Sequence, residues 1–423
     1  MKIVKKIVKW CIIIGLSYFV LSTLYFGYSD IDSNKGIYKF YWSGLRGIWL
    51  EDRTFGFKIN TIVETKLDGY DGPYVYGNDI YFVDDKSIFH QLKVSTDKKI
   101  VVQTSCEQLP KFIVTLKDSI YIENDFHEVP NKLIAISDIE GNFNGFYSFL
   151  LANKVIDKNG NWIFEKGHLV LNGDFFDRGK QVTQVLWLIY HLENQAVQNG
   201  GKVHFILGNH EVMNMYGDVS YNDFKYMEVA KRISKQNDWD IGLRYLYSYK
   251  SELGRWLRSK SIVQKIGSNI FVHGGLNIFH LEGKYSLQDL NSISRKYYGV
   301  YPTEKSVKDK RDRVLINSIN SPFWDRRLNL EWKYKLMYKL NGINAKATTQ
   351  TELESILKFY NAKTLIIGHS VVDDITSDYN NKVFKIDVKH GQTINSGKSK
   401  GLLIENKTFY KVDDLSNRSP LCY

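Results

Sequence analysis

Five short apolar runs in the later part of the chain each end in a polar residue. With their polar ends they cover residues 133–138, 169–174, 203–210, 270–273 and 365–369. An apolar run of this length bounded by Gly, Asn or Asp is typical of a buried strand. After the second run, apolar side chains recur at helical spacing at Val182, Val185, Leu186 and Ile189. Strands that alternate with helices predict a layered α/β domain from residue 131 onward.

Three other patterns complete this domain. Residues 215–260 are mostly helical in pattern and interrupt the strand series, so we expect them to cap the site. Thr349 and Glu352 form a capping-box pattern that predicts the start of a late helix. β-type runs return near the end, at 383–388, 402–405 and 408–410. We therefore expect a domain over residues 131–412 and a C-terminal tail over 413–423.

Residues 29–130 have a different pattern. Their short β-type runs are separated by Asp, Gly, Asn and Lys, which favour turns. The runs are 74–76, 79–83, 99–102 and 119–122. We expect a small β-rich domain here, with no chemical constellation of its own.

The N-terminal segment has the pattern of a membrane anchor. Lys2, Lys5, Lys6 and Lys9 precede residues 10–28, which contain no charged residue. About 20 residues are needed to cross a bilayer as a helix, and flanking lysines stay on the cytoplasmic side. Residues 1–28 therefore predict an uncleaved signal anchor, a single-pass transmembrane helix that leaves the rest of the chain outside the cytoplasm. A cleaved signal peptide and a buried core helix are the alternatives.

Composition narrows the set of partners. The formal net charge is +11, which fits phosphorylated substrates, an anionic membrane surface or nucleic acid. The lysines are scattered and form no long basic block with interleaved aromatics, so we expect no nucleic acid. Three cysteines are too few for a disulfide scaffold or a zinc–thiolate site.

The polar ends of the five runs carry the candidate chemistry. Ligands bind outside the carboxyl ends of strands in open α/β folds. The residues gathered there combine carboxylate, amide and imidazole donors, and they are Asp138, Asp174, Asn209, His273 and His369. This donor set predicts a dinuclear metal site. His168, His191 and His204 lack the flanking pattern, and we interpret them as structural.

Three further residues stand next to these donors. His210 follows Asn209 and is suited to protonate a leaving oxygen as a general acid. Asp177 lies three residues after Asp174 and can orient another side chain. Arg178 can place its guanidinium fork on a phosphate.

The ordered motifs resemble the calcineurin-like metallophosphoesterases. They run from Ser137-Asp138-Ile139-Glu140-Gly141-Asn142 through Gly173-Asp174-x-x-Asp177-Arg178-Gly179, Gly208-Asn209-His210-Glu211 and His273-Gly274-Gly275 to Gly368-His369. Within that family they are most similar to the phosphoprotein-phosphatase type, and especially to the bacterial Shewanella-like phosphatases. The resemblance covers roughly residues 131–412 and implies a layered β-sandwich flanked by helices.

The resemblance also implies roles and an activity. Two divalent cations would activate a water that attacks phosphorus, with Mn²⁺ expected and Fe, Zn or Mg as alternatives. Asp138 would bind the first cation, Asp174 would bridge both, and the other three donors would complete the second site. His210 would be the acid, oriented by Asp177. Phosphate would be held by Arg178 and Arg326, with Arg255 and Arg258 as weaker candidates.

One position departs from the family. The first motif normally reads Asp-x-His-Gly, whereas this chain has Glu140 in place of the histidine. If Glu140 is a ligand, the first site is all oxygen, which favours Mn²⁺ or Mg²⁺ and a more alkaline optimum. If Glu140 points away, the first site is weak or empty, and a degraded, binding-only homologue has to be considered.

The expected function is a membrane-anchored phosphomonoesterase that acts on phosphoproteins or small phosphoesters. The anchor and the bacterial resemblance together place its catalytic domain on the periplasmic side of an inner membrane. A phosphodiesterase or pyrophosphohydrolase acting on nucleotides or envelope phosphates is the alternative enzyme. A non-catalytic phosphate-binding module is the alternative outside the enzyme class, and the intact donor set argues against it.

Overall fold

The computed structural model describes residues 2–26, 54–58, 61–340 and 342–421, and its contacts divide the chain into two compact units. The first unit comprises residues 1–68 and 224–229. Its described elements are helix α1 (Lys2–Phe26), the antiparallel pair β1 (Thr54–Lys58) and β2 (Thr61–Thr65), and the first residues of helix α6 (Phe224–Ser234). Among the residues described, no helix combines the length and apolar character needed to cross a bilayer. The expected membrane span over residues 10–28 is therefore not confirmed, and its last two residues lie outside the described ones.

The second unit is built on two six-stranded sheets. The first sheet has the order β11-β10-β9-β17-β18-β19, in which β9, β10 and β11 are parallel. Its strands are β9 (Lys132–Ile136), β10 (His168–Asn172), β11 (Lys202–Ile206), β17 (Lys400–Glu405), β18 (Thr408–Asp413) and β19 (Arg418–Pro420). The sequence predicts a C-terminal tail over residues 413–423. In the structure, β19 pairs with β18 and extends the sheet.

The second sheet has the order β15-β16-β14-β13-β12-β8. The neighbours β13, β14 and β16 are parallel, so their carboxyl ends share one edge. Its strands are β8 (Phe126–His127), β12 (Val263–Ile266), β13 (Asn269–Val272), β14 (Thr364–Ile367), β15 (Thr376–Asp378) and β16 (Val383–Lys385).

A continuous apolar core lies between the two sheets. Leu133, Val170 and Ile206 from the first sheet form one buried cluster with Phe271 and Ile366 from the second. The apolar runs of the sequence form this core, because a strand that is covered by other layers on both faces is apolar along most of its length. The α/β fold of sheets and helices expected from the sequence is confirmed.

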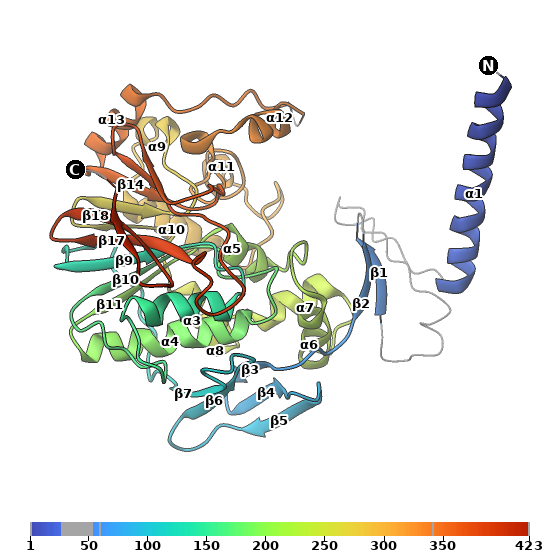
Figure 1. The fold of residues 1–423 in the computed structure, drawn as a ribbon, viewed down its shortest axis with the longest axis horizontal. Helices are drawn as coiled ribbons and strands as arrows, with labels where there is room; N and C mark the ends of the chain where they lie inside the picture. Colours follow the sequence, from blue (N-terminus) through green and yellow to red (C-terminus); the bar gives the residue numbers. More distant parts are fainter. Residues whose placement is uncertain (1, 27–53, 59–60, 341, 422–423) are drawn as a thin grey trace. The chain divides into compact units, whose positions relative to one another are not determined.

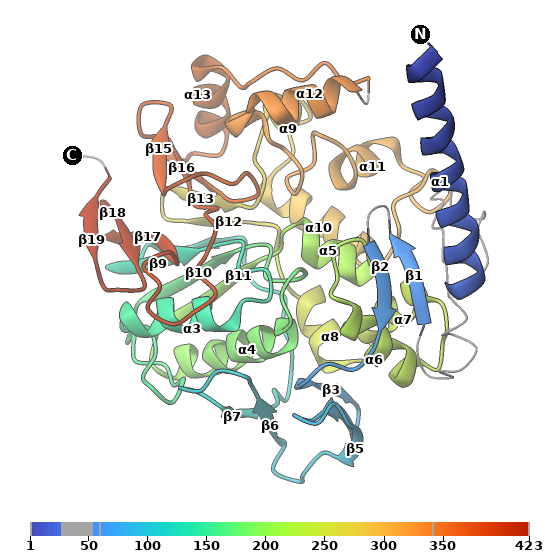
Figure 2. The ribbon, with the colours of Figure 1, turned by 45° about the vertical axis from the view of Figure 1, so that its right-hand side comes forward.

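Helices cover the outer faces of this sandwich. Helices α3 (Phe143–Ala152) and α4 (Val182–Gln198) lie along the β9–β11 side in Figures 1 and 2, and α4 packs on β11. Helix α10 (Leu287–Tyr297) packs on β12 of the other sheet. The remaining helices of this region are α9 (Ile278–Glu282), α11 (Lys310–Ile316), α12 (Trp332–Leu340) and α13 (Gln350–Phe359), with a 3-10 turn at Arg327–Asn329. Helix α13 starts after Thr349, whose hydroxyl accepts from the Glu352 amide as its capping box requires.

Residues 215–260 are helical, as the pattern indicated. They form α5 (Asn209–Tyr216), α6 (Phe224–Ser234), α7 (Trp239–Leu246) and α8 (Glu252–Arg258). The chain between α5 and α6 carries Tyr221 and Asn222, which both contact the candidate site described below.

The β-rich segment before residue 130 is not a separate compact unit. Its strands pack on helices α4 and α8, and the contact division places everything from Gly69 onward with the catalytic sheets, except for residues 224–229. The strands are β3 (Asp71–Tyr76), β4 (Asp79–Val83), β5 (Phe89–Lys93), β6 (Lys99–Gln103) and β7 (Lys111–Thr115). The strand expected at 119–122 was wrong: Tyr121 and Ile122 are exposed there and pair with none of the strands in the described part of the chain.

Candidate metal centre and active site

Three predicted metal donors meet at the carboxyl ends of strands from both sheets. Asp174 follows β10, His273 follows β13 and His369 follows β14. One ligand atom from each lies within 4.8 Å of the other two, and all three side chains are buried. Asn209, the first residue of α5, joins them because its Oδ1 lies 3.1 Å from His273 Nε2. The structure thus brings four of the predicted donors together.

A hydrogen bond orients the His273 ring and leaves its second nitrogen available for a metal. His273 Nδ1 donates to the Asn172 carbonyl oxygen at 2.9 Å, which leaves Nε2 facing Asp174 Oδ2 at 2.9 Å. Metal-ligating histidines usually give their other ring N–H to such an acceptor. The Nε2 atom of His369 is buried and has no hydrogen-bond partner among the residues that the structure describes. A buried polar atom without a partner is costly, and a cation at this position would satisfy it.

Asp138 lies beside this group. It follows β9, and its Oδ2 accepts from the His369 amide at 3.3 Å. Burial, and then the neighbouring carboxylates of Asp387 and Asp174, hold the pKa of Asp138 well above its usual range. Two close carboxylates that repel one another mark a place where a cation would be stabilised.

The loops that carry these donors are held in unusual conformations. Asp138, Asp174 and His369 all have positive φ, at 55°, 60° and 64°. Such backbone is strained for residues with a side chain and collects at functional sites. The buried carboxylate of Glu211 holds one of these turns by accepting from the amides of Gly208, Asp174 and Phe175 at 2.7, 3.0 and 2.7 Å.

His210 and Asp177 form a buried pair next to the donors. His210 Nδ1 lies 2.5 Å from Asp177 Oδ2, and its Nε2 lies 3.7 Å from Asp174 Oδ2. Burial alone would lower the pKa of His210, but Asp174 and Asp177 outweigh it and raise that pKa to about 9. The other oxygen of Asp177 accepts from the side-chain amides of Asn214, at 2.9 Å, and Asn222. The imidazole is therefore oriented, and its Nε2 faces the metal donors.

The sequence is similar to those of known phosphoesterases and phosphatases. A family model described as calcineurin-like phosphoesterase matches residues 131–373. The chain belongs to the calcineurin-like phosphoesterase family. The phosphoesterase is 30% identical over 306 residues to Shewanella-like protein phosphatase 1 of Plasmodium berghei, which covers 71% of this chain and 76% of that protein. It is 24% identical over 338 residues to Shewanella-like protein phosphatase 2 of Arabidopsis thaliana, covering 67% and 82%.

A solved structure supports the same assignment. The cold-active protein-tyrosine phosphatase of a psychrophilic Shewanella species matches with a TM-score of 0.70 and 30% identity, covering 84% of this chain and 99% of that one. The resemblance expected from the motifs is thus confirmed, and the phosphoesterase is a hydrolase of the metallophosphoesterase class.

Glu140 has a partner in this phosphoesterase. Its carboxylate forms an ion pair with the guanidinium of Arg178, and their side chains are 25% and 50% exposed. Glu140 is outside the group of three donors that lie within reach of one cation. The residue that replaces the expected histidine therefore contacts the residue predicted to hold phosphate.

The other predicted arginines divide into two cases. Arg326 lies at the site, because its guanidinium donates to the His369 carbonyl oxygen and to Ser370 Oγ, the latter at 3.1 Å. Arg255 instead pairs with Glu252, and Arg258 donates to carbonyl oxygens of Tyr247 and Gly254. Within the part of the chain that the structure describes, neither of these two contacts the donors.

Sequence reasoning missed Asp387. Ile367 of β14 pairs with Lys385 of the parallel strand β16, and His369 and Asp387 each follow two residues later. Asp387 is 3% exposed, and burial followed by the charge of Asp174 raises its pKa to about 6. The run 383–388 gives only a weak signal, because Lys385 interrupts its apolar residues and Val388 follows Asp387.

The residues present fit two divalent cations, which this family generally uses. Asp174, Asn209, His273 and His369 supply mixed oxygen and nitrogen donors for one. The carboxylates of Asp138, Asp174 and Asp387 offer oxygen donors for the other, and hard oxygen donors favour cations such as Mn²⁺ and Mg²⁺.

Proposed function

We propose that this protein hydrolyses phosphomonoesters, with phosphoproteins as its substrates. The buried group of Asp174, His273 and His369, with the His210–Asp177 pair beside it, carries the proposal. The similar proteins named above are protein phosphatases, which supports a phosphorylated side chain as the substrate.

The chain's own residues define the steps around phosphorus. Divalent cations, when bound, would activate water and stabilise charge on the phosphoryl oxygens. Arg326 would donate to those oxygens from beside His369, and Arg178 would join it by exchanging Glu140 for phosphate. His210 would give its Nε2 proton to the leaving oxygen, while Asp177 stabilises the imidazolium at Nδ1.

The test is hydrolysis of p-nitrophenyl phosphate by purified protein, first stripped of metal and then supplied with Mn²⁺. Turnover that needs the metal and disappears in Asp174→Ala supports the proposal. Phosphotyrosine and phosphoserine peptides, compared with bis-p-nitrophenyl phosphate, then separate monoesterase from diesterase activity. Folded protein that shows no turnover with any divalent metal on any of these substrates contradicts it.

We also propose that the catalytic unit lies outside the cytoplasm. The support is the lysine-flanked, uncharged segment over residues 10–28. Fusing residues 1–40 to a reporter that is active only outside the cytoplasm tests the topology. Activity of a cytoplasm-specific reporter on the same fusion would overturn it.

A further inference from the structure

A second group of metal-binding side chains lies away from the active site. Glu123, His127 and His204 each offer a ligand atom, and these atoms lie within 4.8 Å of one another. His168 is outside this group of three but is hydrogen-bonded to it, with its Nδ1 2.9 Å from His204 Nε2. From the sequence alone, His168 and His204 are interpreted as structural residues.

The hydrogen bonds of this group prepare two of the rings as ligands. His127 Nε2 lies 2.8 Å from the Asn124 carbonyl oxygen, and His204 Nδ1 lies 2.7 Å from Gln264 Oε1. Both partners are carbonyl oxygens, which only accept, so both ring nitrogens must be donors. The remaining nitrogens, His127 Nδ1 and His204 Nε2, then carry lone pairs, and that of His204 accepts from His168 Nδ1, a hydrogen bond that a metal would have to replace. This second-shell arrangement is the one that orients metal-ligating histidines.

The group joins the edges of the two sheets. His127 lies on β8, the edge strand of one sheet, and His204 lies on β11, the edge strand of the other. The sheets already meet here, because the Leu207 amide donates to the Ser261 carbonyl oxygen at 2.9 Å. His168 is the first residue of β10, whereas Asn172 at its other end leads to the catalytic Asp174. His168 thus lies at the opposite end of β10 from the active site, while His204 lies in the middle of β11.

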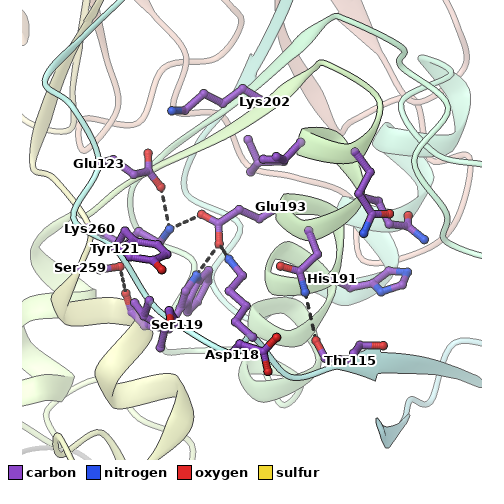
Figure 3. Close-up of a pocket in the computed structure, with 18 residues that line it drawn as sticks. Thr115, Asp118, Ser119, Tyr121, Glu123, His191, Glu193, Lys202, Ser259 and Lys260 are labelled. Carbon is purple, nitrogen blue, oxygen red and sulfur yellow. Dashed lines mark hydrogen bonds and ion pairs between the residues drawn. The ribbon is translucent and has the colours of Figure 1, made fainter. Parts of the chain in front are cut away.

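Neighbouring charges restrict which cation could bind. Burial is the main reason that His127, His168 and His204 all have a lowered pKa. Glu123 is ionised but already pairs with Lys260, at 2.8 Å between Oε1 and Nζ (Figure 3). A carboxylate shared with a lysine would hold Mg²⁺ or Ca²⁺ weakly, since these bind oxygen donors through charge.

Imidazole-rich sites instead select cations of the zinc type. Zn²⁺ binds neutral imidazole nitrogen and carboxylate oxygen, in sites that are usually four-coordinate and tetrahedral. We propose that Glu123, His127 and His204 form a structural site for Zn²⁺ or a similar transition metal, which ties β8 to β11, and that His168 joins it by exchanging its hydrogen bond to His204 for the metal. The cation contributes to holding the open edge of the sandwich and takes no part in phosphate hydrolysis.

Metal counting on the full-length protein tests the site. Chelator-treated protein is saturated with Zn²⁺, desalted, and its bound zinc is measured. His127→Gln and His168→Gln, at half-buried positions, are each expected to hold one equivalent less than the unsubstituted protein. His191→Gln is the matched control, because this half-buried histidine is outside the group and should lose none.

Two further measurements separate this site from the catalytic centre. Co²⁺ added to Asp174→Asn should still give the strong visible absorption of a tetrahedral site, and His127→Gln introduced into that variant should abolish it. Gln264→Leu should weaken Zn²⁺ binding about 10- to 100-fold, because it removes the acceptor that orients His204. Mn²⁺-dependent hydrolysis by His127→Gln should stay within about twofold of the original rate, which also shows that the variant folds.

Equal zinc content in His127→Gln, His168→Gln and the unsubstituted protein would overturn the site. So would Co²⁺ absorption in the Asp174→Asn variant that survives His127→Gln. Either result would leave a hydrogen-bonded histidine network without a metal, and the proposed phosphatase activity would be unaffected.

Discussion

Asp177→Asn is the substitution whose outcome the structure defines most closely. One carboxylate oxygen of Asp177 accepts from the amides of Asn214 and Asn222, and the other accepts from His210 Nδ1. In the variant, the side-chain oxygen has to stay with the two asparagine donors, because an NH₂ group there would face two other NH₂ groups. The new NH₂ group therefore turns to His210 Nδ1, which then has to accept.

The chemical effect follows from this exchange. His210 keeps a single proton, on Nε2, and loses the carboxylate that stabilised its charged form. A neutral imidazole is a far weaker acid than imidazolium, so the leaving oxygen departs without a proton. General acid catalysis contributes about 10²- to 10⁴-fold, which corresponds to about 2.7–5.4 kcal/mol of transition-state stabilisation.

The assay compares two leaving groups in Mn²⁺-loaded protein. With phenyl phosphate, kcat of Asp177→Asn should fall about 10²- to 10⁴-fold. With p-nitrophenyl phosphate the fall should be at least about tenfold smaller, since p-nitrophenolate leaves readily without a proton. KM should change little for either substrate. Equal losses of kcat on both substrates would refute the reasoning, because they would show that Asp177 only maintains the shape of the site.

Three other substitutions test separate parts of the molecule. Glu140→Gln should lower KM for p-nitrophenyl phosphate by at most about fivefold, because it frees Arg178 from a half-exposed ion pair. Asp387→Asn should raise the Mn²⁺ concentration for half-maximal activity about 10- to 100-fold, measured with metal-stripped protein, as expected for losing a carboxylate beside the metal. Lys260→Met should reduce the free energy of unfolding in urea by about 3 kcal/mol, because it leaves the buried carboxylates of Glu123 and Glu193 without their shared cation.

Each of these has an outcome that contradicts it. A large rise in the Mn²⁺ requirement of Glu140→Gln would show that Glu140 is a metal ligand and not a partner of Arg178. An unchanged Mn²⁺ requirement in Asp387→Asn would place that carboxylate outside the metal site. A loss below about 1 kcal/mol in Lys260→Met would mean that solvent or Lys117 compensates the two carboxylates.

The active-site strands could be read from the sequence because their signal is local. Each combines an apolar run, which has to be buried, with a polar residue where the strand ends. The run 383–388 follows this rule only in part, because Lys385 interrupts its apolar residues and Val388 follows Asp387. By contrast, Ser119 to Ile122 has strand-like residues but no neighbouring strand to pair with, and local composition carries no information about partners.

The sequence by itself determined the five buried strands of the site, the donor types at their ends, and the departure at Glu140. These features depend on the pattern of apolar residues and on the chemistry of single residues, which are local properties of the sequence. The tertiary structure decided which residues these side chains contact. Glu140 pairs with Arg178, and Asp387 lies at the same level of the sheet as His369. Arg255 pairs with Glu252, and Arg258 donates to the Gly254 carbonyl oxygen. The tertiary structure also brought His127 of one sheet edge to His204 of the other. Such contacts between residues far apart in sequence depend on strand register and sheet packing, which no local pattern specifies.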